Sequence, residues 1–208
     1  MDIKIDNNAI GNIDSVSNGD VFGLKSDSSP YALPFQFENY YDDRAVKKFI
    51  QSVEKLIRTS REYNSYIESL RTNIYALNHD VIQGEITTAD VDLEFHHYPL
   101  TLYEIVEICM LTHIDRMEHF TTFSLAKEIM NYHFKNEIGI VPLTKTNHEL
   151  VHDGKLFIST KQIFGNYKKF IEDHKDGISA EIMNNIATIE YYSNQNIAND
   201  FQRILEID

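Results

Sequence analysis

The pattern of hydrophobic and polar positions predicts a mostly helical chain with two short strands. From Asp43 onward, hydrophobic residues recur every three or four positions, which is the helical period. A second run of this kind follows and extends to Gly84, where we expect the helix to end. The inward positions of this predicted helical pair are Val46, Phe49, Ile50, Val53, Leu56 and Ile57, then Tyr66, Ile67, Leu70, Ile74, Leu77 and Val81.

The middle of the chain changes period. Residues 91–96 alternate between hydrophobic and polar side chains, as a half-buried strand does, and Pro99 closes that strand. Thr101 followed by Glu104 is a capping-box sequence, which predicts that a helix begins there. A further helix is expected over Thr122 to Lys135.

A second short strand is expected at Ile138 to Leu143. The helix after it is expected to open at another capping-box sequence, Thr146 to Glu149, and to stop at Gly154. Leu156 to Ile158 is typical of a small strand. Three helices are expected to finish the chain, over about 160–173, 180–192 and 195–206.

These elements predict an α+β fold that is mostly α. The 42% hydrophobic content suffices for a buried core. Residues 1–43, rich in Asn, Ser and Asp, are expected to form an extended or disordered arm. Residues 44–85 then form the helical pair. A small core with both strands spans 86–158, with helices inserted at 101–135, and 159–208 is a C-terminal helical region.

Composition narrows the chemistry. The single cysteine, Cys109, excludes an intrachain disulfide and a zinc-thiolate cluster, so a metal ion is expected on histidine, carboxylate or water. Cys109 lies on the hydrophobic face of its predicted helix and is interpreted as a small core residue. The chain lacks a secretion signal and any stretch of ~18 apolar residues, so we expect no membrane contact and a cytoplasmic location, the host cytoplasm if phage-encoded.

The net charge of −13 is spread unevenly. The N-terminal arm and residues 176–208 are acidic, whereas residues 44–63 and 138–175 are basic. The overall acidity disfavours strong non-specific binding to nucleic acid, although local patches matter more than total charge at physiological salt. The acidic arm and tail are candidate contacts for a protein partner.

Two short segments hold four of the nine histidines. His148 and His152 are four residues apart, so on a helix their rings share one face and are able to bind one ion. His96 and His97 end the first strand, where neighbouring side chains point to opposite faces. One member of that pair is therefore a candidate ligand, and the other is expected to face a substrate.

Strand, strand and short helix, with histidines at both ends, resemble the three-histidine type of the HNH endonuclease family and its ββα-metal motif. The overall layout also resembles proteins of large phages. The resemblance implies that residues 86–158 form an HNH-like core and that the chain hydrolyses DNA phosphodiester bonds. It further implies one divalent ion (Zn, Mn, Ni or Mg) on His96, His148 and His152, with His97 as general base. Lys145 and Lys155 are candidate phosphate contacts.

The sequence departs from the family pattern at two points. Gly139 occupies the position of the family's middle asparagine, for which Asn136 or Asn147 are candidate substitutes, and fifty residues separate His97 from His148. An alternative is therefore a catalytically inactive HNH-like module that uses the metal structurally and serves as a binding or assembly protein. In a third reading no ion binds.

The remaining polar residues near the motif have simpler interpretations. Glu94 is either part of a solvated strand face or a support for a ligand histidine. His133 is the one further histidine expected to approach the site. The other four are interpreted as surface or turn residues: His79, His113, His119 and His174.

Overall fold

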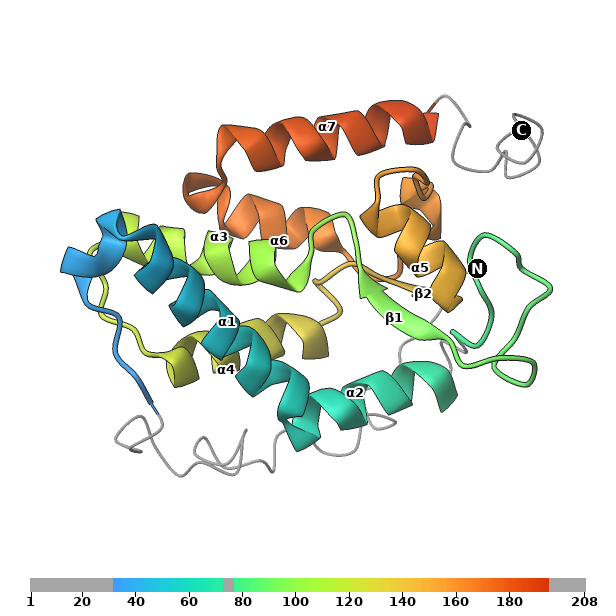
Figure 1. The fold of residues 1–208 in the computed structure, drawn as a ribbon, viewed down its shortest axis with the longest axis horizontal. Coiled ribbons are helices and arrows are strands. Elements are labelled where there is room, and N and C mark those ends of the chain that lie inside the picture. The colour runs from blue at the N-terminus through green and yellow to red at the C-terminus, as the bar shows by residue number, and fades with distance from the viewer. Residues whose placement is uncertain (1–31, 73–76, 195–208) are drawn as a thin grey trace.

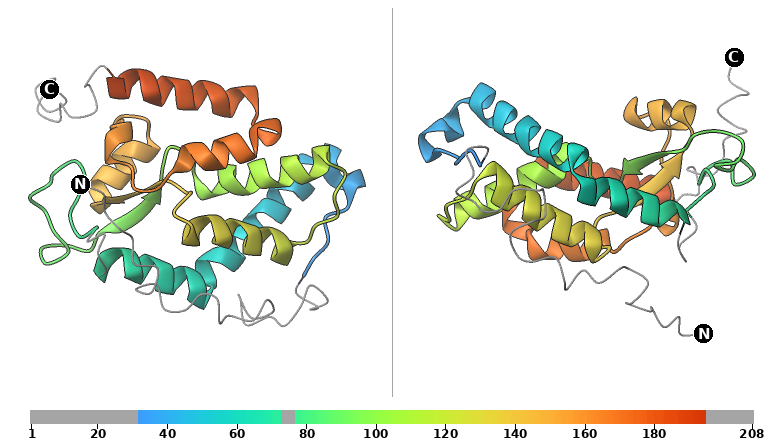
Figure 2. Two further views of the ribbon diagram at one scale, coloured as in Figure 1. Left: turned by 180° about the vertical axis from the view of Figure 1, so that it is seen from behind. Right: turned by 90° about the horizontal axis from the view of Figure 1, so that it is seen from below.

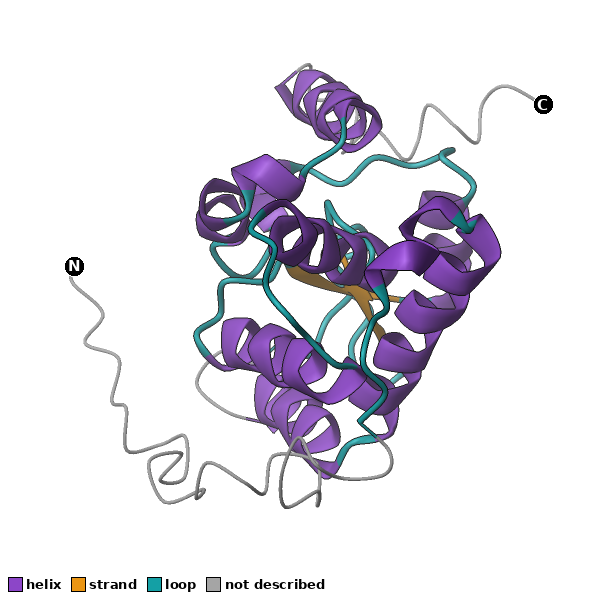
Figure 3. Ribbon diagram, turned by 90° about the vertical axis from the view of Figure 1, so that its left-hand side faces the viewer, coloured by secondary structure: helices purple, strands orange, loops and turns teal. Residues whose placement is uncertain are grey.

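The computed structural model describes residues 32–72 and 77–194. Helices make up most of this part of the chain, and one two-stranded antiparallel sheet lies among them (Figures 1 and 3). The predicted α+β, mostly α class is therefore confirmed. The first part of the predicted arm, residues 1–31, and the helix expected at 195–206 lie outside the described residues.

The described end of the arm packs onto the helices. Phe35 is buried and its ring stacks on Phe120, with 5.3 Å between the ring centroids. The short 3-10 helix η2 (Phe37–Tyr41) follows. Asp42 then caps helix α1 (Asp43–Thr59), because its carboxylate accepts hydrogen bonds from the first backbone N–H groups of the helix. α1 begins where the sequence pattern predicted.

Helix α2 (Arg61–Thr72) is shorter than predicted. The extension of this helix to Gly84 is wrong, because residues 77–91 form a loop. Asp80 is fully buried in that loop, and its carboxylate accepts hydrogen bonds from the backbone N–H groups of Ile82 and Gln83. An aspartate that bonds to the backbone just after itself favours a turn over a helix.

Helices α3 (Leu102–Asp115) and α4 (Thr122–Phe134) occupy the predicted insertion between the strands. The capping box of Thr101 and Glu104 is present, as predicted. The two helices pack on each other and on α1, and α4 also contacts α2. Their buried hydrophobic faces contribute to the main core, with residues that include Ile105, Val106, Leu125 and Ile129.

The two predicted strands are present as β1 (Glu94–His97) and β2 (Ile140–Leu143), and they pair antiparallel. Helix α5 (Lys145–His152) contacts both strands and lies over them (Figure 2). The N-cap of α5 is Thr144, whose hydroxyl accepts from the backbone N–H of Asn147. The predicted capping box at Thr146 to Glu149 is therefore wrong by two residues.

The C-terminal region holds α6 (Tyr167–Asp173) and α7 (Ala180–Asn194), with the 3-10 helices η3 (Thr160–Gln162) and η4 (Lys175–Gly177) before them. The helix expected over 160–173 is split near Gly165, where φ is +94° and a Cβ would lie 2.2 Å from the Ile138 carbonyl oxygen.

The small strand expected at Leu156 to Ile158 is also wrong. The backbone N–H of Leu156 donates to the Leu150 carbonyl oxygen, and that of Ile158 donates to the Tyr98 hydroxyl. These groups are therefore used outside any strand pairing.

In the described part of the chain, none of the helices combines the length and the hydrophobicity that crossing a bilayer requires.

Candidate metal centre

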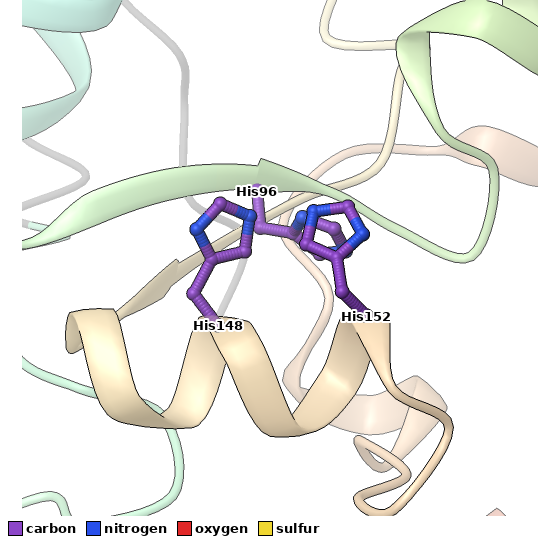
Figure 4. A group of neighbouring side chains, drawn as sticks. All are labelled: His96, His148 and His152. Carbon is purple, nitrogen blue, oxygen red and sulfur yellow. The ribbon is translucent and has the colours of Figure 1, made fainter.

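Two elements that are far apart in the sequence bring three histidines together. His96 extends from β1, and His148 and His152 extend from one face of α5 (Figure 4). The ring centroids are 4.6 Å apart for His96 and His148, 4.7 Å for His96 and His152, and 4.6 Å for His148 and His152. One nitrogen of each ring lies within 4.8 Å of the other two. The three residues predicted as metal ligands therefore converge.

Buried polar contacts hold α5 in this position. Asp80 accepts hydrogen bonds from the backbone N–H of Thr144 at 2.6 Å and from the Asn147 side-chain amide at 2.9 Å. Because Thr144 and Asn147 belong to the first turn of α5, the loop that follows α2 fixes the start of this helix. The sequence pattern missed this role of Asp80, which lay inside a predicted helix.

Glu94 contacts one of the three histidines. Its carboxylate forms a hydrogen bond with Nδ1 of His148. A carboxylate accepts hydrogen bonds, so Nδ1 of a neutral His148 carries the hydrogen and Nε2 keeps its lone pair. Metal-binding histidines commonly have such an outer partner, which fixes the orientation of the ring. The predicted supporting role of Glu94 thus has its contact in the structure.

The electrostatic surroundings keep the rings of His96 and His152 neutral. Burial, together with the neighbouring His148 and His152, lowers the pKa of His96 to about 3. Burial also lowers the pKa of His152, with a smaller contribution from His148. Neutral imidazole is the form that binds a metal ion. His96 and His152 therefore present lone pairs, and not positive charges, at neutral pH.

A small cavity of about 80 Å³ adjoins the three rings. The guanidinium-bearing side chain of Arg58, near the end of α1, lines it beside Phe95, Thr101 and Leu102. Three imidazole ligands suit zinc, nickel or manganese, whereas magnesium prefers oxygen ligands. The donor set therefore fits a transition-metal ion better than magnesium.

His97 points away from this cluster and lies in the core. It is 3% exposed, and its Nε2 is 2.9 Å from Nε2 of His133. Nδ1 of His133 donates to the Ile129 carbonyl oxygen, so Nε2 of His133 accepts the hydrogen from His97. Burial lowers the pKa of His97 well below its usual value and that of His133 to about 4.

His97 also helps to line the small cavity, but its Nε2 is used by His133, so the expectation that it faces a substrate stays a prediction. His133, which was expected to approach the site, reaches His97 instead of the three-histidine cluster. Of the predicted phosphate contacts, Lys145 is exposed at the first residue of α5. Lys155 lies beyond the C-cap of that helix, where it is exposed and pairs with Asp153 at 2.9 Å.

The asparagine positions also differ from the HNH pattern. A Cβ at Gly139 would lie 2.0 Å from the Tyr98 carbonyl oxygen, so no asparagine side chain fits there. Asn147 is buried and donates to Asp80. Asn136 accepts a hydrogen bond from the Tyr66 hydroxyl at 3.4 Å. The contacts of both candidate substitutes are thus with structural residues.

A second group of metal-binding side chains was not predicted. Cys109 and His174 are buried together with the partly buried Glu128. The interpretation of Cys109 as a core residue is consistent with its burial. His174 lies in the turn after α6, as one of its two interpretations had it, but it is not a surface residue, because its exposed fraction is 2%. These residues come from separate elements with no short spacing between them, so the sequence carries no local signal.

The comparison with protein families gives a different assignment from the sequence motif. The sequence model of the bacteriophage G278-like virion protein family matches residues 1–206. Searches of curated proteins and of solved structures give no significant match. The HNH endonuclease assignment is wrong, because the virion family accounts for almost the whole chain whereas the HNH resemblance covered two short segments. The expected likeness to phage proteins agrees with the match, but DNA cleavage has no support.

Proposed function

We propose, since this chain belongs to the bacteriophage G278-like virion protein family, that it is a structural component of the phage particle. In this proposal, the unit of β1, β2 and α5 is stabilised by one divalent metal ion, bound by His96, His148 and His152. This unit of two strands and one helix serves assembly or protein binding, and it needs no catalytic base. This function agrees with the burial of His97 in the core.

The observation that carries the metal proposal is the convergence of three imidazoles from two separate elements. Helix α5 has eight residues, of which Asn147 alone is fully buried. Isolated helices of this length are marginal in water. An ion shared by His96 on β1 and two residues of α5 would tie this short helix to the sheet.

The partner of a virion component is another protein of the particle. The net charge of −13 favours a partner that offers a basic surface. The acidic N-terminal arm and C-terminal tail are the proposed contacts, and residues 1–31 of the arm and 195–208 of the tail lie outside the described residues. Steering by such charges weakens as salt increases, because a Debye length is about 8 Å at physiological ionic strength.

The structural role is tested on the particle itself. Mass spectrometry of purified particles of the phage that encodes the chain is expected to detect it at a constant ratio to the major capsid protein. Particles that lack the chain while infected cells contain it would contradict the virion role and leave the metal site as a separate question.

The metal site is tested by unfolding the purified full chain in zinc and in EDTA. An ion at 100 times its dissociation constant stabilises the folded state by about 2.7 kcal/mol. His152→Ala should lose this contribution, because His152 is an exposed residue and the substitution removes little besides a ligand. His79→Ala, at an exposed histidine in the loop, is the matched control and should keep it. An equal zinc response in His152→Ala and the control would refute the site.

A further inference from the structure

Three helical elements bring a second set of ligand atoms together in the interior. Cys109 comes from α3, Glu128 from α4, and His174 from the residue after α6. Sγ of Cys109 is 3.6 Å from Nε2 of His174, and that nitrogen is 3.2 Å from Oε1 of Glu128. Cys109 is fully buried and His174 is 2% exposed.

These two separations fit two edges of a zinc coordination tetrahedron, and all three ligand atoms lie within 4.8 Å of one another. With Zn–S of about 2.3 Å and Zn–N or Zn–O of about 2.0–2.1 Å, tetrahedral angles place sulfur and nitrogen about 3.6 Å apart and nitrogen and oxygen about 3.3 Å apart. The observed 3.6 Å and 3.2 Å are close to both values. Little movement of the side chains would be needed to bind an ion.

The hydrogen-bond accounting calls for positive charge between these groups. Nδ1 of His174 lies 3.1 Å from the Phe170 carbonyl oxygen, so this nitrogen is the donor. In a neutral His174, the lone pair of Nε2 then faces the acceptor oxygen of Glu128 at 3.2 Å. Two acceptors at this distance repel each other unless a proton or a cation lies between them.

We propose that Cys109, Glu128 and His174 bind a second divalent metal ion, distinct from the ion of the three-histidine cluster. The thiol of Cys109 releases its proton to solvent and binds the ion as a thiolate. Any proton carried by Nε2 of His174 is likewise released to solvent. A nitrogen–sulfur–oxygen donor set selects zinc over magnesium or calcium. This inference uses neither the virion role nor the first metal site.

The surroundings supply a supporting contact and an entry route. Nε2 of His113 lies 2.6 Å from Oε2 of Glu128, the oxygen that does not face His174, and Nδ1 of His113 lies 2.7 Å from Glu118. Such outer hydrogen bonds orient a carboxylate ligand. The Glu128 side chain is 30% exposed, so an ion reaches the cluster from that side.

The same burial argues against a catalytic thiol. Cys109 is completely buried, and burial together with Glu128 raises the pKa of its thiol well above the usual value. A nucleophilic cysteine needs thiolate character and access to a substrate. The bound ion would instead connect α3, α4 and the end of α6, joining the C-terminal helices to the main core.

Cobalt(II) is the probe that separates the two sites. The chain has a single cysteine, so a near-ultraviolet charge-transfer band from thiolate to cobalt can arise only from Cys109. Full-length wild type saturated with cobalt in a thiol-free reductant should show the band. His152→Ala should keep it, because the three-histidine cluster contains no sulfur. Cys109→Ala should lose the band and one bound metal per chain.

A second substitution guards against misfolding of Cys109→Ala. Glu128→Gln keeps the size of the side chain but removes the anionic ligand, and should weaken the cobalt titration followed at the band by about tenfold or more. Glu118→Gln, at the outer end of the same hydrogen-bond chain, should leave the affinity within a few-fold of wild type. A folded wild type without the band at saturating cobalt, or Glu128→Gln with wild-type affinity, overturns the proposal.

Discussion

The two faces of strand β1 place adjacent histidines in opposite environments. His96 points toward α5 and joins His148 and His152 beside a small cavity. His97 points into the helical core, where it donates to His133 and stacks on Tyr63, with 6.1 Å between the ring centroids. The same residue type therefore serves as a candidate ligand on one face and as a packed hydrogen-bond donor on the other. Strand alternation, and not residue identity, decides which role each histidine takes.

The largest expected effect is the loss of folding stability at low pH that the buried His133 causes. The folded-state pKa of His133 is about 4, because of burial, and a histidine in the unfolded chain titrates near 6.5. The unfolded state therefore binds more protons between these values, so stability is complete above about pH 6.5 and falls as the pH drops toward 4. The shift corresponds to about 3 kcal/mol. Urea unfolding in EDTA at several pH values measures this loss.

The groups around His133 sharpen this pH test. His97 on β1, Tyr63 and Tyr66 on α2, and Arg58 on α1 face this ring, and Arg58 further lowers the pKa of His133. His133→Gln is expected to be less stable at pH 7 but to show a shallower dependence of stability on pH. An unchanged slope in this variant would contradict the assignment.

The next effect separates the two faces directly. His97→Ala removes a buried ring and leaves Nε2 of His133 without its donor, which should cost about 2–3 kcal/mol of unfolding free energy. Its zinc content should remain that of wild type. His96→Ala is the matched neighbour and should lose one bound ion. Equal loss of zinc in both variants would show that the two faces are not independent.

A smaller effect is expected from Glu94, which contacts one of the three candidate metal ligands. Glu94→Gln removes the carboxylate that contacts Nδ1 of His148, and loss of such an outer partner typically weakens metal binding at least tenfold, or about 1.4 kcal/mol. A zinc titration with a competing chelator measures this change. Asp92→Asn, an exposed acidic position just before β1, is the control for charge alone. A tenfold loss in both variants would make the effect one of general charge.

The smallest effect concerns Lys155, in the turn that follows α5. Lys155 pairs with Asp153 at 2.9 Å, and both side chains are exposed. Exposed ion pairs of this kind contribute about 0–1 kcal/mol. Lys155→Ala should change the unfolding midpoint by less than the metal-site variants do, and should keep the zinc content. A loss of zinc would contradict this expectation and show that Lys155 contributes to metal binding.

Local sequence patterns were sufficient for most of the elements. Helical periodicity located α1 and α4, and the Thr101 capping box located the start of α3. The pattern failed where a tertiary contact decides the local structure. Hydrophobic spacing extended α2 through Leu77 and Val81, but the buried hydrogen bonds of Asp80 hold that segment as a loop.

The two candidate metal sites differ in the same way. The spacing of His148 and His152, with His96 at the end of a strand, gave a correct expectation of convergence. The family drawn from that geometry was nevertheless wrong, because two strands and a helix carrying histidines describe a way of arranging ligands and not a particular ancestry. Cys109, Glu128 and His174 stayed hidden, because tertiary packing alone brings them together.

The most direct test of the central claim is the amount of zinc bound per chain. Wild type and the double variant His148→Ala/His152→Ala are dialysed against the same zinc-containing buffer and analysed for metal and protein. The three-histidine site predicts that the double variant, still folded by circular dichroism, holds one ion fewer per chain. An identical ratio of zinc to protein would contradict the site.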